Sequence, residues 1–357
     1  MISDNDLDLI RQLTGIPGLS GREKPVADFI YSKLVSSGWE LSRDRLNNVL
    51  AKKSGTGPHI MFIAHIDEVG LMVRKITDDG FVLVHRVGGL NPVSVSGRKF
   101  DLWTGKGKVS AFCGTLPPHF AGKQAVPEIE NLYMDVCAET KKDVHDLGIR
   151  IGDGITSHPE FDQIGNRICG KALDDRLGCF IMMKLIEKIN EFESVRNPVT
   201  MAFVSLEETM TLEAAPVIRQ CSPDIVIGID GTLPFDTPDI TDKQCDIALG
   251  KGFCIKWMDA IRGKAAYYPD WNLMNVITDF AEKNDIPFQS EVVVGICNAL
   301  SPVAFMNQGI STVSFSIPIR YHHSGYEMAD IRDIQSLLSF ISNLLEEGIF
   351  SQENHIW

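Results

Sequence analysis

Residues 201–208 read MAFVSLEE, and this stretch decides how the rest of the chain is interpreted. Six apolar or small residues lead directly into the adjacent carboxylates Glu207 and Glu208. This pattern predicts a buried strand that delivers two negative charges where it leaves the core. Burying even one unpaired carboxylate is costly, so a positive partner has to meet the pair. That partner is either a lysine or arginine side chain, or a metal ion with further ligands elsewhere.

The composition is that of a globular protein with a large core. The chain has 357 residues, of which 44% are hydrophobic and 23% are charged. This length suits two domains, or one large α/β domain with an insertion. The net charge of −13 comes from 34 Lys and Arg against 47 Asp and Glu. It argues against nucleic acid and anionic membranes as partners, because both bind basic surfaces.

The cysteines and the first residues predict a cytoplasmic protein. The eight cysteines are scattered without a C-x-x-C pair, which is typical of reduced thiols. The start, MISDNDLDLIRQL, is acidic where a secretory signal is basic.

Residues 292–319 carry no charge over a length that could span a bilayer. Their Pro, Gly and Asn residues instead predict a buried strand, a loop and a second strand.

Two parts of the chain have the alternating pattern of an α/β domain. At its beginning, apolar spacing predicts helices over residues 4–13 and 20–37, the second with Ser20 as its N-cap. Apolar strands are expected at residues 47–52 and 59–63. Helical spacing returns after residue 170, and further strands and helices follow to the end of the chain.

The stretch between these two parts has a different character. From residue 69 to residue 164, short strands alternate with Gly-containing turns and show little helical periodicity. We therefore expect an α/β domain made of residues 1–68 and 165–357, with residues 69–164 inserted as a separate barrel or sandwich. The alternative is that these strands extend a single sheet.

Polar side chains follow the apolar segments of the α/β part. His65 ends a predicted strand, and the H-x-D spacing lets Asp67 bond the ring nitrogen that does not face a metal. An aspartate pair, Asp174 and Asp175, begins a buried helix, where an N-cap is the simplest role. Asp230 ends the apolar run DIVIGI.

These groups are expected to share one edge of the sheet. In open α/β sheets ligands bind at the carboxyl ends of the strands, where segments distant in sequence converge. Two imidazoles and three carboxylates suit two zinc-like ions, and a fourth carboxylate is left as a base. The candidates are His65, either Asp174 or Asp175, Glu207, Glu208, Asp230, and either His322 or His323.

Five motifs, in this order, resemble those of the tetrahedral (TET-type) aminopeptidases, which include glutamyl and deblocking aminopeptidases. They are AHIDEVG, KALDDRLGC, the Glu pair after an apolar strand, DIVIGID and IPIRYHHS. The resemblance covers essentially the whole chain. It implies a mixed-sheet di-metal peptidase domain sandwiched by helices, with an inserted all-β, barrel-like or PDZ-like dimerisation domain.

The resemblance also implies roles for individual residues. Asp174 would bridge two Zn²⁺ or Co²⁺ ions, Glu207 would act as general base and acid, and Asp67 would orient His65. In the family's register Asp174 is preferred to Asp175, and His323 to His322 because the ligand directly precedes Ser324. The implied ligands are His65, Asp174 and Asp230 for one ion, and Asp174, Glu208 and His323 for the other.

The same resemblance implies an enzyme that removes N-terminal residues from peptides. It implies a homododecamer in which twelve subunits enclose the active sites. The chain departs from the family's pattern at residues 209–213, where Gly-Leu-Arg-Gly is usual, and at residues 295–299, where Gly-Thr-Asp-Ala is usual. The preferred N-terminal residue is therefore not predictable from these motifs.

Three rival functions are weaker. A di-metal deacylase or carboxypeptidase of the same broad clan has the H-x-D motif and the bridging Asp much closer in sequence than Asp67 and Asp174 are here. A glycoside hydrolase needs a carboxylate pair across a sugar. A catalytically impaired assembly homologue has no use for a free base beside its metal ligands, so the presence of Glu207 argues against it.

Overall fold

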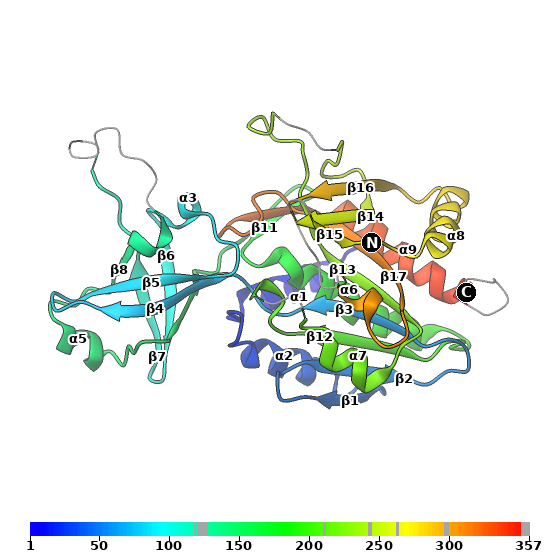
Figure 1. Cartoon of the computed structure of the whole chain (residues 1–357), viewed down its shortest axis with the longest axis horizontal. Helices are drawn as coiled ribbons and strands as arrows, with labels where there is room; N and C mark the ends of the chain where they lie inside the picture. The colour runs from blue at the N-terminus through cyan, green and yellow to red at the C-terminus, as the bar shows by residue number, and fades with distance from the viewer. Residues whose placement is uncertain are drawn as a thin grey trace.

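The computed structural model describes residues 1–117, 119, 128–209, 212–241, 245–261, 264–295, 300 and 302–350. These residues form a large α/β body and a smaller β-barrel beside it (Figure 1). The barrel strands lie between residues 70 and 157, inside the sequence of the α/β body. This arrangement confirms the expected α/β fold with an inserted all-β, barrel-like part.

A mixed sheet of nine strands, counted over the described residues, forms the centre of the α/β body. Its strands are β1 Glu40–Arg43, β2 Val49–Lys53, β3 Ile60–His65, β12 Val199–Val204, β13 Ile225–Thr232, β14 Phe253–Ile261, β15 Lys264–Tyr267, β16 Phe288–Val294 and β17 Ser311–Pro318. Their order is β1-β2-β12-β3-β13-β17-β14-β15, and β16 also pairs with β14. The four central strands β12, β3, β13 and β17 run parallel, so their carboxyl ends meet at one edge.

Helices cover both faces of this sheet. They are α1 Asp4–Gly15, α2 Lys24–Leu34, α6 Leu173–Glu191, α7 Ala215–Cys221, α8 Trp271–Lys283 and α9 Ile331–Glu346, with the 3-10 turns η2 Glu207–Thr209 and η3 Val303–Phe305. Helices α1, α2, α6, α8 and α9 share a core with one face of the sheet. Helix α7 and the turn η3 pack on the other face.

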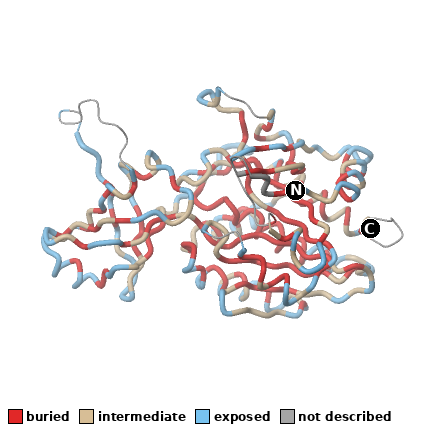
Figure 2. Tube along the Cα trace, in the orientation of Figure 1, coloured by how far each residue is buried: buried red, intermediate tan, exposed pale blue. Residues whose placement is uncertain are grey.

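The β12 strand shows why both faces need a cover. Met201 and Phe203 point into the core on the α6 side, whereas Ala202 and Val204 point into the core on the α7 side. All four side chains are buried. Figure 2 shows that buried residues predominate in the interior of the large α/β body. Since side chains alternate along a strand, a continuous apolar run buries both faces and predicts a central strand.

The inserted strands close into a barrel with its own core. They are β4 Gly70–Ile76, β5 Phe81–Val87, β6 Lys99–Thr104, β7 Gly107–Phe112, β8 Tyr133–Asp135 and β9 Gly154–Ser157, with α3 Pro92–Val95, α5 Lys141–Asp146 and the turn η1 Ile129–Asn131 between them. The barrel order is β4-β5-β8-β7-β6-β9. Val84, Leu102 and Ile155 belong to a core that is separate from those of the sheet. The alternative of one extended sheet is therefore wrong.

A small antiparallel sheet lies next to the large one. Its strands are β10 Phe161–Ile164, β11 Arg167–Gly170 and β18 Glu327–Asp330, in that order. Gly170 stands opposite Glu327, which brings the start of α6 beside the loop that precedes β18.

Two sequence predictions need comment. The second helix begins at Lys24, so Glu23, and not Ser20, stands at its N-cap position. The Glu23 side chain makes no cap hydrogen bond, because it accepts hydrogen bonds from the backbone N–H groups of Gly21 and Leu206. The uncharged stretch 292–319 contributes parts of β16, η3 and β17, while residues 296–299 and 301 lie outside the described residues. Over the described part of the chain, no helix has the length and apolar character needed to cross a membrane.

Candidate metal centre

The predicted site residues come together at the edge where the parallel strands end. β3 ends at His65, and Asp230 lies near the end of β13. β12 ends at Val204, so the glutamate pair does not continue the strand but begins the 3-10 turn η2. The remaining two groups come from the start of α6 and from the turn after β17, namely Asp174 and His323.

His65 and two carboxylates form the first half of the centre. The Nε2 atom of His65 lies 3.2 Å from Oδ1 of Asp174 and 3.8 Å from Oδ1 of Asp230. These three ligand atoms lie close enough together to hold one ion. The Oε2 atom of Glu207 is 4.0 Å from the same ring nitrogen. Glu207 thus stands at the border of this group.

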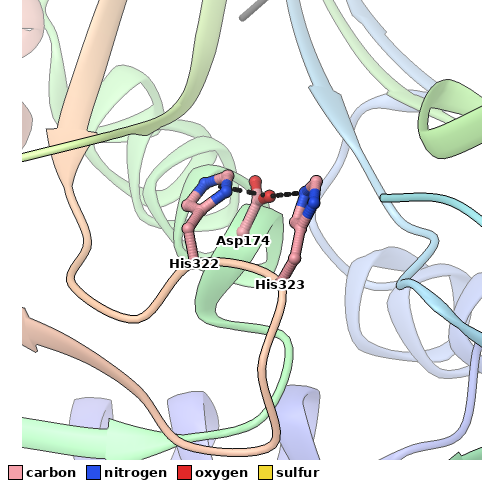
Figure 3. Close-up of side chains that lie close together, drawn as sticks. All are labelled: Asp174, His322 and His323. Atoms are coloured by element: carbon pink, nitrogen blue, oxygen red, sulfur yellow. Dashed lines mark ion pairs between the residues drawn. The ribbon is translucent and has the colours of Figure 1, made fainter. Parts of the chain in front are cut away.

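Asp174 also faces the second half of the centre with its other oxygen. Nε2 of His323 lies 3.3 Å from Oδ2 of Asp174 and 3.3 Å from Oε2 of Glu208. Figure 3 shows the Asp174 carboxylate between two imidazole rings. On the far side of its ring, Nδ1 of His323 lies 3.3 Å from the carbonyl oxygen of Gly89 in the barrel. A proton on Nδ1 leaves Nε2 free to bind a metal.

Asp67 contacts residues of both halves of the centre. Its Oδ1 lies 3.4 Å from Nδ1 of His65. The same carboxylate accepts hydrogen bonds of 3.1 Å from the backbone N–H groups of both Glu207 and Glu208. Asp67 is completely buried, and these contacts hold its pKa below the usual value although burial opposes ionisation. It therefore holds the backbone of both glutamates and lies against the imidazole of His65.

Asp175, the alternative to Asp174, has a different environment. The peptide bond between the two aspartates is cis. Asp175 is fully buried, and its carboxylate accepts hydrogen bonds from the backbone N–H groups of His65 and Gly178. Asp174 thus faces the imidazoles, whereas Asp175 bonds the backbone.

Two residues of the centre were not predicted as site residues. Glu327 accepts hydrogen bonds from the backbone N–H groups of Asp174 (3.0 Å) and His323 (2.9 Å), so it fixes both segments. His322 is the less favoured of two adjacent histidines in the motif, yet its Nε2 lies 3.1 Å from Oδ2 of Asp174. The histidine pair is a visible signal for His322, whereas nothing in the pattern around Glu327 marks that residue.

A buried ion pair supports the start of α6. Nζ of Lys171 lies 2.6 and 2.7 Å from the two oxygens of Glu68, and both side chains are almost wholly buried. Glu68 also accepts a hydrogen bond from the backbone N–H of Gly18, and Nη2 of Arg176 is 3.8 Å away. These contacts join the residues after β3 to the segment that carries Asp174.

The electrostatics of the centre indicate that positive charge is needed there. Burial and the charge of Asp174 raise the pKa of Asp230 to about 7. Burial, together with Asp230 and Glu208, raises the pKa of Glu207 well above its usual value. In contrast, the imidazoles of His322, His323 and His65 outweigh burial and hold the pKa of Asp174 well below its usual value. Divalent cations among these oxygens and nitrogens would relieve the repulsion, so the donor set fits such ions.

A pocket of about 600 Å³ opens beside His322, between the barrel and the large sheet. Most of its wall is apolar, with Val93, Leu233, Phe235, Ile240 and Ile319 among its lining residues. The guanidinium of Arg320 in this wall is paired with Asp236 at 2.7 and 2.8 Å.

The structure describes only part of the two segments, 209–213 and 295–299, in which the sequence departs from the family's pattern. Residues 210–211 and 296–299 fall outside the described residues.

Sequence comparison agrees with the motifs. The model of the family described as M42 glutamyl aminopeptidase matches residues 47–340. A lysyl aminopeptidase of Pyrococcus furiosus is 30% identical over 96% of this chain and 97% of its own. A glutamyl aminopeptidase of Lactococcus lactis subsp. cremoris is 29% identical over 95% of each chain.

Solved structures agree as well. An aminopeptidase from the archaeon Desulfurococcus kamchatkensis superposes with a TM-score of 0.91 at 32% identity, covering 98% of this chain and 97% of that one. The TET1 peptidase of Pyrococcus horikoshii, which can assemble into a tetrahedron or a large octahedral shell, has a TM-score of 0.84 at 26% identity, over 96% and 99% of the two chains. The chain therefore belongs to the M42 glutamyl aminopeptidase family and is an aminopeptidase, an enzyme that hydrolyses peptides.

Proposed function

We propose that this aminopeptidase works with two divalent ions, Zn²⁺ or Co²⁺, bound at the centre described above. The observation that carries the proposal is the Asp174 carboxylate, which turns one oxygen to His65 and the other to His323. This is the arrangement expected of a bridging ligand. The proposed ligands are His65, Asp174 and Asp230 for one ion and Asp174, Glu208 and His323 for the other.

The protein side chains have separate tasks in this proposal. Bound ions would supply Lewis acidity toward water and the scissile carbonyl, and an anchor for the free amine of the peptide. Glu207 takes the proton of the attacking water and passes it to the leaving amine. Burial and the charges of Asp230 and Glu208 raise its pKa, which favours a carboxylate that can hold a proton before passing it on. Asp67 keeps Glu207 in place through the backbone hydrogen bond.

The adjacent glutamates allow a matched test. The wild-type enzyme, stripped with chelator and reloaded with Zn²⁺ or Co²⁺, is assayed on a panel of aminoacyl chromogenic amides that includes acidic, basic and apolar residues. Glu207→Gln should keep both ions and lose about 10²- to 10⁴-fold in kcat. Glu208→Gln should instead lose one ion. Full activity of Glu207→Gln with both ions bound would refute the assigned base, and no turnover by the reloaded wild type on any substrate would refute the proposal.

We also propose an assembly and a division into domains. Residues 1–68 and 165–357 would form the catalytic domain, and residues 69–164 the inserted domain, which makes subunit contacts. The separate core of the barrel supports the division.

The likeness to the TET1 peptidase supports a homo-oligomer, and we propose a dodecamer in the cytoplasm. Size-exclusion chromatography with light scattering should give about twelve times the 39.6 kDa of one chain; a stable monomer would contradict the assembly.

A further inference from the structure

His322 lies at the centre without a role in the mechanism above. Its Nε2 is 3.1 Å from Oδ2 of Asp174, against 3.3 Å for Nε2 of His323 (Figure 3). The two imidazole rings are 4.6 Å apart and inclined by 32° to each other. Both rings therefore present the same nitrogen to the same carboxylate oxygen. One nitrogen from each ring and one oxygen of Asp174 lie close enough together to hold one ion.

The Nε2 atom of His322 is not used in any other way among the described residues. It is buried and makes no hydrogen bond there, and its approach to Asp174 lacks the geometry of one. Leaving a buried polar atom without a partner carries a cost in folding free energy. A positive ion at this point would remove that cost. The lone pair of a neutral imidazole nitrogen is the ligand that zinc-like ions prefer.

A glycine beside the ring keeps Nε2 of His322 clear of any side chain from that position. Gly231 lies directly opposite: a Cβ at that position would stand 2.7 Å from Nε2 of His322 and 3.1 Å from Oδ1 of Asp174. Only glycine leaves this space open.

We propose that His322 is an additional ligand of the ion held by Asp174, Glu208 and His323. This inference rests on the proposed function, because it requires the second ion. With His322 the second ion would have two imidazoles and two carboxylates, whereas the first would have one imidazole. A nitrogen-rich set favours Zn²⁺, Co²⁺ and Ni²⁺ over Mn²⁺ and Mg²⁺, which prefer oxygen ligands. The two ions of one subunit should therefore differ in metal preference.

The test measures metal binding and does not depend on turnover. Chelator-stripped enzyme is titrated with Co²⁺ while the visible absorption of the bound ion is recorded, and each affinity is measured by competition with an indicator. His322→Gln keeps a polar side chain that can still hydrogen-bond Asp174 but removes the imidazole. We expect the second ion to bind at least about 10-fold more weakly and its absorption spectrum to change, with the first ion unaffected. Competition should also show that the second ion's preference for Zn²⁺ over Mn²⁺ decreases.

One control tests the loss of an imidazole elsewhere in the protein, and a second tests whether the variants fold. His59→Gln removes a half-buried imidazole that is bonded to Thr200 outside the centre, and it should bind both ions as the wild type does. Circular dichroism and the elution volume check folding; His322→Leu, which fills the space with an apolar group, repeats the test if the Gln variant is unstable.

The outcomes separate the two proposals. If the wild type binds two ions and His322→Gln binds them with unchanged affinity and spectrum, this inference is wrong and the proposed function stands. The inference is equally wrong if only the affinity falls while the spectrum of the second ion stays the same, since His322 then acts only by positioning Asp174. If the wild type binds fewer than two ions, the two-ion function fails and this inference with it.

Discussion

Replacing Lys171 by Met tests the role of the buried ion pair beside the centre. The ammonium of Lys171 and the carboxylate of Glu68 lie 2.6 Å apart, with 2% and 4% of their side chains exposed. The chain offers a control with the same distance: Lys24 and Asp28 on α2 are also 2.6 Å apart, but 71% and 48% exposed. The two substitutions thus compare a buried lysine that contacts both oxygens of its partner with an exposed lysine that contacts one.

The expected loss follows from what remains around Glu68. Removing one partner of a buried pair costs about 3–5 kcal/mol, because the other charge stays buried. Here the N–H of Gly18 and, at 3.8 Å, the guanidinium of Arg176 still face the carboxylate, so we expect a value near the lower end, about 3 kcal/mol. Lys24→Met should cost less than about 1 kcal/mol, as exposed pairs do.

The assay is unfolding of the chelator-stripped enzyme in guanidinium chloride, monitored by circular dichroism at one protein concentration. Adding Glu68→Gln to Lys171→Met should recover part of the loss, because it removes the buried charge that is left without its partner. A deficit equal to that of Lys24→Met would refute this account.

Three further substitutions have definite expectations. Gly231→Ala would place a methyl group 2.7 Å from the ring of His322, so metal content measured by atomic absorption should fall; unchanged content contradicts the proposed geometry. Burial raises the pKa of Glu23 to about 7 from 4.5, so ionising it destabilises the fold as pH rises through this range. Glu23→Gln should therefore gain about 2–3 kcal/mol in unfolding free energy at pH 8 and nothing near pH 4.5, whereas equal effects at both pH values would exclude this cause. Asp67→Asn would set an amide donor against one of two backbone N–H donors, and kcat/KM should fall at least about 10-fold with the fold intact by circular dichroism; wild-type kcat/KM would show that the lost hydrogen bond does not matter for activity.

The sequence was sufficient for the segments that carry the centre. The apolar runs before His65 and Asp230, and the run of apolar and small residues before Glu207, identify central strands, since a strand covered on both faces needs such a run. Parallel neighbours then bring their ends together, and that reasoning needs no knowledge of loops. The change from helical spacing to short strands and Gly turns likewise indicated the inserted barrel.

The details that depend on contacts between distant segments could not be predicted. The sequence has no signal that Glu327 accepts hydrogen bonds from Asp174 and His323, because an acid before a helix is most often a cap or a surface residue. The capping role expected for Ser20 failed for a similar reason: Glu23 serves the segment after β12, which is distant in sequence. The spacing of apolar residues reports local structure, whereas the hydrogen-bond partners of Glu327 and Glu23 depend on the tertiary fold.

The hydrogen bond partner of His323 has a consequence for protein engineering. Its Nδ1 lies 3.3 Å from the carbonyl oxygen of Gly89, in the loop between β5 and α3 of the barrel. A shortened enzyme in which a linker replaces the barrel would keep every predicted ligand and still lose the group that sets which nitrogen of His323 is protonated. The barrel is therefore not a detachable module. A minimal catalytic fragment of this chain would need at least that loop, held at its present position.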